Sequence, residues 1–598
     1  MHFTKKQIYP LLLIVLAALV ALALRLYHIG DLQLQFDEWL GGWHANPELI
    51  WNGSLSDFVR LFWENVRHYV TSGQTIAWSS TVEAIKLFTG SNVVAIRLVA
   101  ACGGAFGAAI VTIIAWKMFN RNPAALLAAA AVAVFSVPGI IFGQFADVYA
   151  AAVGVSALQL LVYYFWTRPR GDCRAWLVFA AAAFIAQLFM YTQLWLTAGI
   201  FLAGFWEFLL EKKPAAIIHS LIPAGLLYGA LSGLHLAAML QIIPWSESFR
   251  SYMASYYPMF WKGGQAGGTM WNIPGYFLWR IYDLFNYHFS LAFRPAIYQP
   301  LQWNWVSLPF LVVLVAGIAG RIQVGRTRLA IRLSAKQTGK GNNRLNYQSD
   351  GIVRLLLTTL ISCLIANVLF LLPFGGCRQM LFILPLFALF YGWLVYMIIY
   401  TLRGYRKTGI QYVLSILLIA LPIIPFGISF PAVYENRISR INLDLICDIL
   451  NDKQDLPLFA SEQNIHILEM ALYADPRFEN IFWPGYKYPC DALDADFITD
   501  FPTLSFIFKG RYRKIYWVRN GYFPSKIDEG IWIDMHISRR SRYEGSQMRK
   551  FYPTPEETIP AGYNLSTIEE CPGNSPDALH QSIYWPPNSF YLYKIRQR

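Results

Sequence analysis

The sequence predicts an α-helical protein that crosses a membrane many times and ends in a smaller soluble domain. Of its 598 residues, 56% are hydrophobic and only 14% are charged, whereas soluble domains carry about 25% charged residues. The mean hydropathy is +0.37, and apolar runs long enough to span a bilayer recur along most of the chain. An ordinary soluble fold is therefore excluded for the chain as a whole.

Eleven apolar segments are expected to give about 11 transmembrane helices. They are residues 8–24, 93–116, 123–144, 148–166, 175–190, 194–210, 215–243, 303–320, 355–373, 380–400 and 413–430. Pro123 opens the third segment, at a position where helices favour proline. Two more helices are expected between spans: an amphipathic helix over Leu55 to Tyr69 that lies on the membrane surface, and a re-entrant helix over Pro274 to Phe293.

Most of the excess of basic residues lies in short loops between the apolar segments, and these basic loops alternate along the chain. The clusters are Lys5/Lys6, Lys117/Arg121, Arg168/Arg170/Arg174, Lys212/Lys213, residues 321–354 and Arg403/Arg406/Lys407. Because cytoplasmic loops carry the excess of Lys and Arg, the N-terminus is expected inside and the end of the chain outside. The same pattern accounts for the net charge of +13 without a nucleic-acid partner. A cleaved signal peptide is an alternative for the first segment, but the many later segments favour an uncleaved helix.

Two domains are expected, a transmembrane part over residues 1–433 and an extracytoplasmic soluble domain over residues 434–598. In the second, the alternating run from Lys514 to Val518 is typical of a β-strand, so we expect an α/β or α+β fold. No internal repeat of fixed period is visible in the sequence. This counts against a transporter built from inverted repeats.

Polar residues that could carry chemistry gather on the expected outer side. They are Asp37 and Glu38 after the first segment, Arg97 near the outer end of the second, Gln144, Asp147 and Tyr149 between the third and fourth, and Arg378 at the start of the tenth. Charges so close to lipid are costly and usually mark a site or a water-filled cavity. A carboxylate can remove a proton from an acceptor hydroxyl, and an arginine can hold a phosphate through two parallel hydrogen bonds. The combination suits a reaction between a lipid phosphate and a hydroxyl group.

Several of these residues also have a purely structural interpretation. Arg97 and Arg378 could anchor helix ends at lipid headgroups, and Tyr149 could be an interfacial aromatic residue. Gln144 and Asp147 are three residues apart, so they share one face only if that stretch is helical.

Four stretches resemble the multi-spanning glycosyltransferases of the GT-C fold that use polyprenyl-phosphate sugars. They are Arg25-Leu26 through Phe36-Asp37-Glu38, then Ala95-Ile96-Arg97-Leu98, then Phe142 through Tyr149, and Cys377 through Pro385. In that order they are similar to the family's first outer loop with its acidic pair, its Arg-Leu start of the second helix, its segment ending in Arg-x-Tyr, and its Arg-Tyr-Leu-Leu-Pro run. Within this group the chain looks most like family 39 glycosyltransferases, the protein O-mannosyltransferase and lipid A aminoarabinose transferase relatives.

The resemblance implies transfer of a sugar, with inversion, from a polyprenyl-phosphate donor to an extracytoplasmic hydroxyl of a lipid, glycan or protein. Asp37 would be the base or bind the acceptor. Adjacent Glu38 would point about 100° away on a helix, which makes it the more dispensable acid. Arg378 and Arg97 would hold the donor phosphate. Some relatives use a divalent metal and others do not; Asp37, Glu38 and Asp147 could hold one through oxygen ligands.

The chain also departs from the family pattern. Asp147 stands where many relatives have Arg, Gln379 stands where Tyr is usual, and Ser72-Gly73-Gln74-Thr75 replaces a His-Pro-Pro pattern. These departures leave the sugar and the acceptor open more than the fold.

The expected protein is thus a glycosyltransferase of the bacterial cytoplasmic membrane, with its site and soluble domain on the outer face. Its expected partners are the lipid-linked sugar donor, membrane lipid and an acceptor. One alternative is a lipid-linked glycan ligase or polymerase, in which arginines would outnumber acids at the site. Another is a non-catalytic transporter or scaffold.

Overall fold

The structure is a computed structural model that divides into two compact units. The first comprises Met1–Ile29 and Leu40–Val433, and the second comprises Gly30–Trp39 and Tyr434–Arg598. The structure describes residues 5–30, 55–71, 75–89, 93–119, 122–242, 273–289, 308–338, 347–369, 371–402, 408–434, 444–452, 456–461, 468, 472, 477–482, 503–518, 529–535, 563–571 and 590–597.

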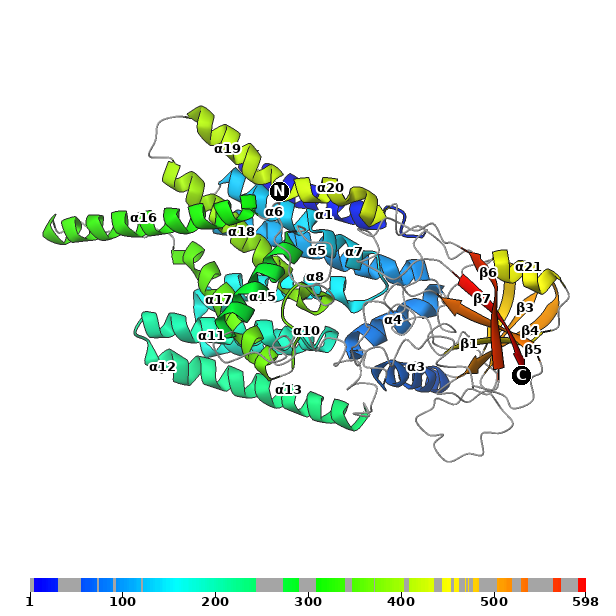
Figure 1. Cartoon of the computed structure of the whole chain (residues 1–598). Coiled ribbons are helices and arrows are strands. Elements are labelled where there is room, and N and C mark those ends of the chain that lie inside the picture. Colours follow the sequence, from blue (N-terminus) through cyan, green and yellow to red (C-terminus); the bar gives the residue numbers. More distant parts are fainter. Residues whose placement is uncertain are drawn as a thin grey trace. The chain divides into compact units, whose positions relative to one another are not determined.

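The first unit is helical throughout its described part (Figure 1). Its helices are α1 (Lys5–Leu26), α3 (Leu55–Thr71), α4 (Ile76–Thr89), α5 (Val93–Met118), α6 (Pro123–Phe135), α7 (Val137–Gly143), α8 (Val148–Val162), η2 (Tyr163–Thr167), α9 (Arg168–Arg170), α10 (Cys173–Phe189), α11 (Gln193–Leu210), α12 (Pro214–Ala216), η3 (Ile217–Leu221), α13 (Ile222–Ile242), α15 (Ile273–His288), α16 (Leu308–Thr338), α17 (Tyr347–Val368), η7 (Arg378–Ile383), α18 (Leu384–Leu402), α19 (Thr408–Ala420) and α20 (Ile423–Tyr434).

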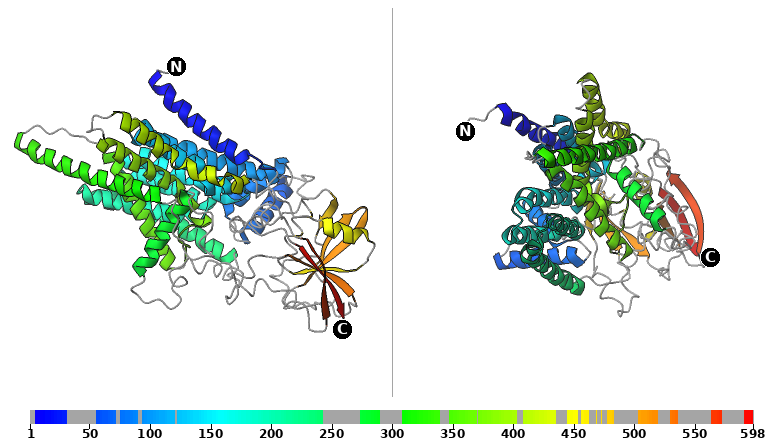
Figure 2. Two further views of the ribbon diagram at one scale, coloured as in Figure 1. Left: turned by 45° about the horizontal axis from the view of Figure 1, so that its top comes forward. Right: turned by 90° about the vertical axis from the view of Figure 1, so that its left-hand side faces the viewer.

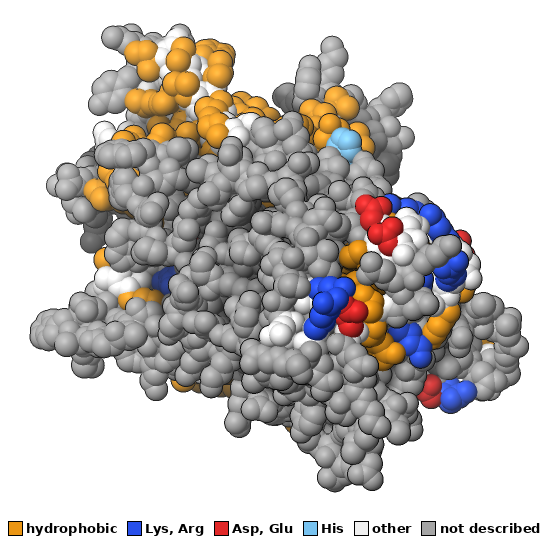
Figure 3. All heavy atoms as spheres, turned by 45° about the vertical axis from the view of Figure 1, so that its right-hand side comes forward, with side chains coloured by type: hydrophobic (Ala, Val, Ile, Leu, Met, Phe, Trp, Pro, Cys, Tyr) orange, Lys and Arg blue, Asp and Glu red, His pale blue; other side chains and the backbone are white. Residues whose placement is uncertain are grey.

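Among the described residues of this unit, six stretches are long and apolar enough to cross a membrane, so the chain is a helical membrane protein. They are Val94–Met118, Val148–Arg170, Gln193–Leu210, Pro214–Met239, Gly351–Val368 and Arg378–Leu402. The pair α6 and α7, bent by 45°, would make a seventh. Apolar side chains also remain exposed on the outer helices, such as Leu226 at 69% and Leu234 at 71%. Figure 3 shows such side chains gathered over the described helices at the top of the view; lipid tails would cover these surfaces.

Helix α18 lies in the core of the unit, with nearly all of its residues buried, and packs against α6 and α16. Helix α5 packs against α1, α6 and α8, and Figures 1 and 2 show α10, α11 and α13 lying along one another. Buried polar side chains join neighbouring helices. The Gln193 amide donates to the Ser156 hydroxyl at 2.7 Å, and the Tyr228 hydroxyl donates to the Gln187 amide oxygen at 2.7 Å. Such bonds stabilise helix pairs in lipid by roughly 1 kcal/mol.

Two expected helices outside the spans are present, namely α3 where the amphipathic helix was predicted and α15 where the re-entrant helix was predicted. Helix α6 begins at Pro123, as predicted, and the Asn122 side chain accepts a hydrogen bond from the Ala125 N–H. The predicted third segment is present but is broken into two helices, α6 and α7. The helix breaks at Ser136, whose hydroxyl caps α7 by accepting from the Gly139 N–H, and Pro138 in the first turn of α7 cannot supply an N–H to continue α6.

Two other predicted boundaries are wrong. Helix α16 continues to Thr338, where a basic loop was expected from Arg321, because residues 321–338 contain no proline and many good helix formers. The eleventh segment is divided into α19 and α20 at Pro422, where proline removes an N–H from the helical ladder.

In its described part, the second unit contains α21 (Asp444–Asn451) and a seven-stranded sheet, so strands and helix occur together as expected. The strands are β1 (Leu458–Ser461), β2 (Phe478–Phe482), β3 (Thr503–Phe508), β4 (Arg511–Val518), β5 (Glu529–Met535), β6 (Tyr563–Cys571) and β7 (Phe590–Gln597). Their order is β2-β3-β4-β1-β5-β7-β6. Strand β1 runs parallel to β4 and β5, and the other pairs are antiparallel. The strand predicted at Lys514 to Val518 is confirmed within β4.

Candidate polar site at one end of the membrane unit

Two residues predicted at the site hold the chain where it leaves α1. The Arg97 guanidinium, on α5, donates from Nη1 to the Ile29 carbonyl at 2.8 Å. The Gln144 amide donates from Nε2 to the Tyr27 carbonyl at 2.9 Å. Carbonyls just beyond a helix end have no hydrogen-bond donor within the helix. The Arg97 and Gln144 side chains supply the donors that α1 does not. Arg97 is 68 positions from its acceptor in the sequence, and Gln144 is 117 positions from its acceptor. The two side chains together fix the short piece of backbone that follows α1.

The fixed piece leads into the stretch that carries Asp37 and Glu38, which lie outside the described residues. Arg97 is only 2% exposed, so the interpretation of this side chain as an anchor in lipid headgroups does not fit. Its geometry favours a positioning role, in which Arg97 holds the backbone just beyond the end of α1.

Arg25, near the end of α1, is a second buried arginine at this end of the unit. It is 1% exposed, and its Nη1 donates to the Ala21 carbonyl at 2.8 Å. Glycines make room for it: a Cβ on Gly104 would lie 2.5 Å from Arg25 Nε, and one on Gly143 would lie 2.6 Å from Arg25 Cδ. Sequence reasoning did not select Arg25 as a site residue. The signal was an arginine inside an apolar helix together with glycines on the two segments that pack on it.

Arg378 has the most open position of the predicted arginines. It is partly exposed and begins η7, and its Cζ lies 5.4 Å from the centroid of the Tyr149 ring in the first turn of α8. Tyr149 packs in turn on Phe142 at 5.3 Å. A guanidinium near an aromatic face gains a cation–π interaction of roughly 0.5–1 kcal/mol or more. The structure thus brings together Arg378 and Tyr149, and Tyr149, at 9% exposure, is not an exposed interfacial residue.

Gln144 and Asp147 do not share a helical face, because the chain turns between them. Helix α7 ends at Gly143, and α8 begins at Val148. Asp147 is the N-cap of α8 and its Oδ1 accepts from the Val148 N–H at 2.6 Å. A carboxylate in this place is stabilised by the positive end of the helix. Asp147 is 5% exposed, so its observed role is structural, at the start of a span.

A buried ion pair on α15 supports the loop that presents Arg378. The Asp283 carboxylate accepts from the Gly376 N–H at 2.7 Å, and Arg280 Nη1 lies 3.5 Å from the same oxygen. Burial raises the pKa of Asp283, while the Gly376 hydrogen bond and the Arg280 charge act in the opposite direction. The adjacent Gly375 has φ +130°, a conformation that L-residues with side chains rarely adopt. Sequence reasoning missed this pair, although an acid and an arginine three residues apart in an apolar helix were visible.

The site residues described above therefore combine four arginines with two aspartates. The arginines are Arg25, Arg97, Arg280 and Arg378, and the aspartates are Asp147 and Asp283. Away from water the field of such charges is stronger than in solution, which suits the binding of a phosphate. Within the described part of the chain, no group of three or more His, Cys, Asp and Glu residues could hold a metal ion.

Comparisons with protein-family models, curated proteins and solved structures find no match for this chain. The fold by itself defines its class, a polytopic helical membrane protein with a sheet in its C-terminal region.

Proposed function

We propose that the chain is a membrane glycosyltransferase that moves a sugar from a polyprenyl-phosphate donor to an extracytoplasmic hydroxyl, with inversion. The observation that carries the proposal is Arg378, a partly exposed guanidinium at the start of a span and beside Tyr149. Arg378 would bind the donor phosphate and stabilise the charge that grows on it as the sugar leaves. Asp37 would take the proton of the acceptor hydroxyl.

The proposal includes eleven spans, with the polar site and the C-terminal unit outside. Three shorter apolar helices, Pro10–Leu26, Cys173–Phe189 and Leu308–Val324, would cross in addition to the six long stretches and the α6–α7 pair. Helices α19 and α20, which divide the predicted segment 413–430, would together make the eleventh span. This count is supported by the basic residues. Arg168 and Arg354 both lie by Glu207, at the end of α8 opposite Asp147. Because cytoplasmic ends carry the Lys and Arg excess, the end with Asp147 would be the outer one.

A lipid-linked glycan ligase is a second candidate, because arginines outnumber acids among the described site residues. Such an enzyme would grip a diphosphate with several guanidinium groups. The two candidates differ in the donor, a lipid monophosphate against a lipid diphosphate.

The test is donor binding and turnover in Arg378→Ala and Arg378→Lys. We expect Arg378→Ala to lower turnover by at least about 100-fold, as for the loss of one group that stabilises developing charge. Arg378→Lys should keep partial activity, because lysine keeps the charge but loses the planar fork. Binding should be measured with polyprenyl phosphate and with polyprenyl diphosphate.

Arg170→Ala is the matched control. It removes the same charge at the end of a different span, Val148–Arg170, where the Arg170 Cζ lies 3.3 Å from the centroid of the Trp166 ring. Parent-like donor binding and sugar transfer in Arg378→Ala, corrected for folded protein, would contradict the phosphate role. Tighter binding of the diphosphate than of the monophosphate would favour the ligase.

A further inference from the structure

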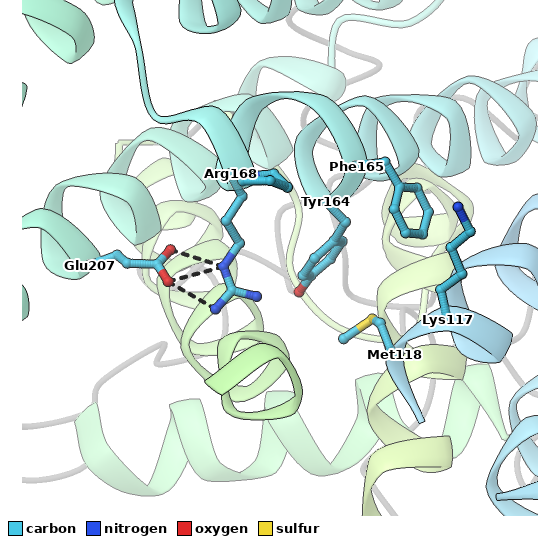
Figure 4. Close-up of a pocket in the computed structure, with 7 residues that line it drawn as sticks. Lys117, Met118, Tyr164, Phe165, Arg168 and Glu207 are labelled. Atoms are coloured by element: carbon cyan, nitrogen blue, oxygen red, sulfur yellow. Dashed lines mark hydrogen bonds and ion pairs between the residues drawn. The ribbon is translucent and has the colours of Figure 1, made fainter. Parts of the chain in front are cut away.

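A second polar site lies at the opposite end of the membrane unit, where two spans finish. Helix α5 ends at Met118, and the span that starts at Val148 ends at Arg170. With a rise of about 1.5 Å per residue, this end lies roughly a bilayer thickness from Asp147. A pocket of about 170 Å³ opens here between α5, η2, α9 and α11 (Figure 4). It is smaller than the roughly 300–1,000 Å³ of ordinary small-molecule sites, so it suits a small group rather than a whole metabolite.

The pocket carries more positive than negative charge. Arg168 donates from Nε and Nη2 to the Glu207 carboxylate at 2.8–3.1 Å. Arg354 lies 3.8 Å from the same carboxylate. Glu207 is therefore shared by two guanidinium groups, and the Lys117 charge at the pocket adds to the excess.

Lys117 has no carboxylate among the residues that the structure describes. Its Nζ lies 4.7 Å from the centroid of the Phe165 ring, and its side chain is exposed at the edge of the pocket. An ammonium group over an aromatic ring keeps its donors available for an anion.

The Tyr164 hydroxyl is the third part of the site. Tyr164 is 6% exposed, it lines the pocket, and its hydroxyl has no hydrogen-bond partner within the described ranges. A buried hydroxyl without a partner costs roughly 1–3 kcal/mol. In Figure 4 the Tyr164 side chain lies between those of Arg168 and Lys117. An anionic oxygen bound in the pocket would accept a hydrogen bond from this hydroxyl and would also neutralise part of the excess positive charge.

The depth of the pocket in the membrane indicates which molecule would supply that oxygen. Two apolar spans finish at the pocket, and Trp166, 40% exposed, lies beside it in sequence and under the Arg170 guanidinium. Exposed tryptophan and cationic side chains at span ends mark the headgroup region of a bilayer. We propose that this pocket binds the phosphate of an anionic membrane lipid, held by the Lys117 ammonium and the Tyr164 hydroxyl and attracted by Arg168 and Arg354. Such binding does not depend on the proposed sugar transfer.

The test uses native mass spectrometry of the full chain in detergent with phosphatidylglycerol, phosphatidylcholine or inorganic phosphate. The variants are Lys117→Gln, which removes the charge, and Tyr164→Phe, which removes only the hydroxyl. Lys213→Gln is the matched control, because it removes an exposed lysine that pairs with Glu211 beyond the end of α11. We expect the parent and Lys213→Gln to retain phosphatidylglycerol equally, and Lys117→Gln to retain it about fivefold less, as for one lysine near an anionic surface.

Tyr164→Phe should also retain less phosphatidylglycerol, and it tests the site independently should Lys117→Gln not fold. Equal retention of phosphatidylglycerol by Tyr164→Phe and the parent would overturn the site. So would a loss in Lys117→Gln no larger than that in Lys213→Gln. Retention of phosphatidylcholine equal to that of phosphatidylglycerol would show that the pocket does not select an anionic headgroup, and it would overturn the proposal. Displacement of phosphatidylglycerol by inorganic phosphate would assign the pocket to a soluble phosphate instead of a lipid.

Discussion

At the scale of single residues, burial separates arginines that look alike in sequence. Arg97 and Arg378 each open an apolar segment near the same expected surface. Arg97 is 2% exposed and bonded to a backbone carbonyl, whereas Arg378 is partly exposed and faces an aromatic ring. The first arrangement positions the chain, and the second leaves a cation where a ligand could reach it.

Arg97→Ala should lower sugar transfer without weakening donor binding. The substitution removes a hydrogen bond from a charged group, worth about 1.5–3 kcal/mol, and frees the chain that precedes Asp37. Turnover should fall at least about 10-fold, as expected when a reacting group loses its alignment. Donor affinity and turnover should be measured side by side with Arg378→Ala. If Arg97→Ala weakens donor binding as much as Arg378→Ala does, Arg97 touches the phosphate directly, as the sequence analysis expected.

Sequence reasoning could find Arg97, Gln144, Asp147, Tyr149 and Arg378 because each interrupts or flanks an apolar run. It could not find their partners, since the Arg97 and Gln144 bonds join residues 68 and 117 positions away from them. Long-range backbone acceptors leave no pattern in a single sequence. Arg25, Arg280 and Asp283 were missed although each stands in an apolar stretch of sequence, because burial, which only packing shows, is what distinguishes them from residues at a helix end.

At the scale of helices, the unit depends on a close crossing of α5 and α8. Gly103 and Gly154 meet there, and a Cβ on Gly154 would lie 2.5 Å from the Gly103 carbonyl oxygen. Small residues at such crossings let helices in a membrane approach closely and gain van der Waals contact. The position of α8 matters for both polar sites, since Asp147 begins it and Arg168 follows it.

Gly154→Ala should destabilise the membrane unit by about 1–3 kcal/mol, the usual cost of overpacking. The added methyl group meets a backbone atom that cannot move aside without separating the helices. Gly225→Ala, in α13, is the control, because a Cβ there meets no atom within 4 Å and alanine is the better helix former. Thermal unfolding in detergent should show a lower Tm for Gly154→Ala alone. Equal Tm values for the two variants would argue against the close crossing.

The sequence predicted where the helices lie better than it predicted where they are interrupted. Apolar runs marked most of the helices, but Ser136 and Pro422 divide two runs that read as continuous. The end of α16 was placed too early because charge was taken as the end of a helix. Charge ends a span at the membrane surface, whereas only backbone chemistry or packing ends the helix itself.

At the scale of the whole chain, one membrane unit carries two polar sites at the two ends of the same span. The end with Arg97, Gln144 and Arg378 is the proposed site of transfer, and the end with Lys117 and Tyr164 is the proposed site for lipid phosphate. The C-terminal unit, with its seven-stranded sheet, is a separate unit in the chain. Figure 3 shows Lys, Arg, Asp and Glu side chains over its described strands, as expected for a surface that faces water.

The most direct test is the release of polyprenyl phosphate by the purified full chain in nanodiscs. A panel of polyprenyl-phosphate sugars should be supplied as donors, with an envelope extract as the source of acceptors. We expect release from at least one donor, and release at least about 100-fold slower for Asp37→Asn, which keeps the size of the side chain but cannot accept the proton. Absence of release from every donor, or Asp37→Asn working at the parent rate with equal folded protein, would contradict sugar transfer driven by this carboxylate.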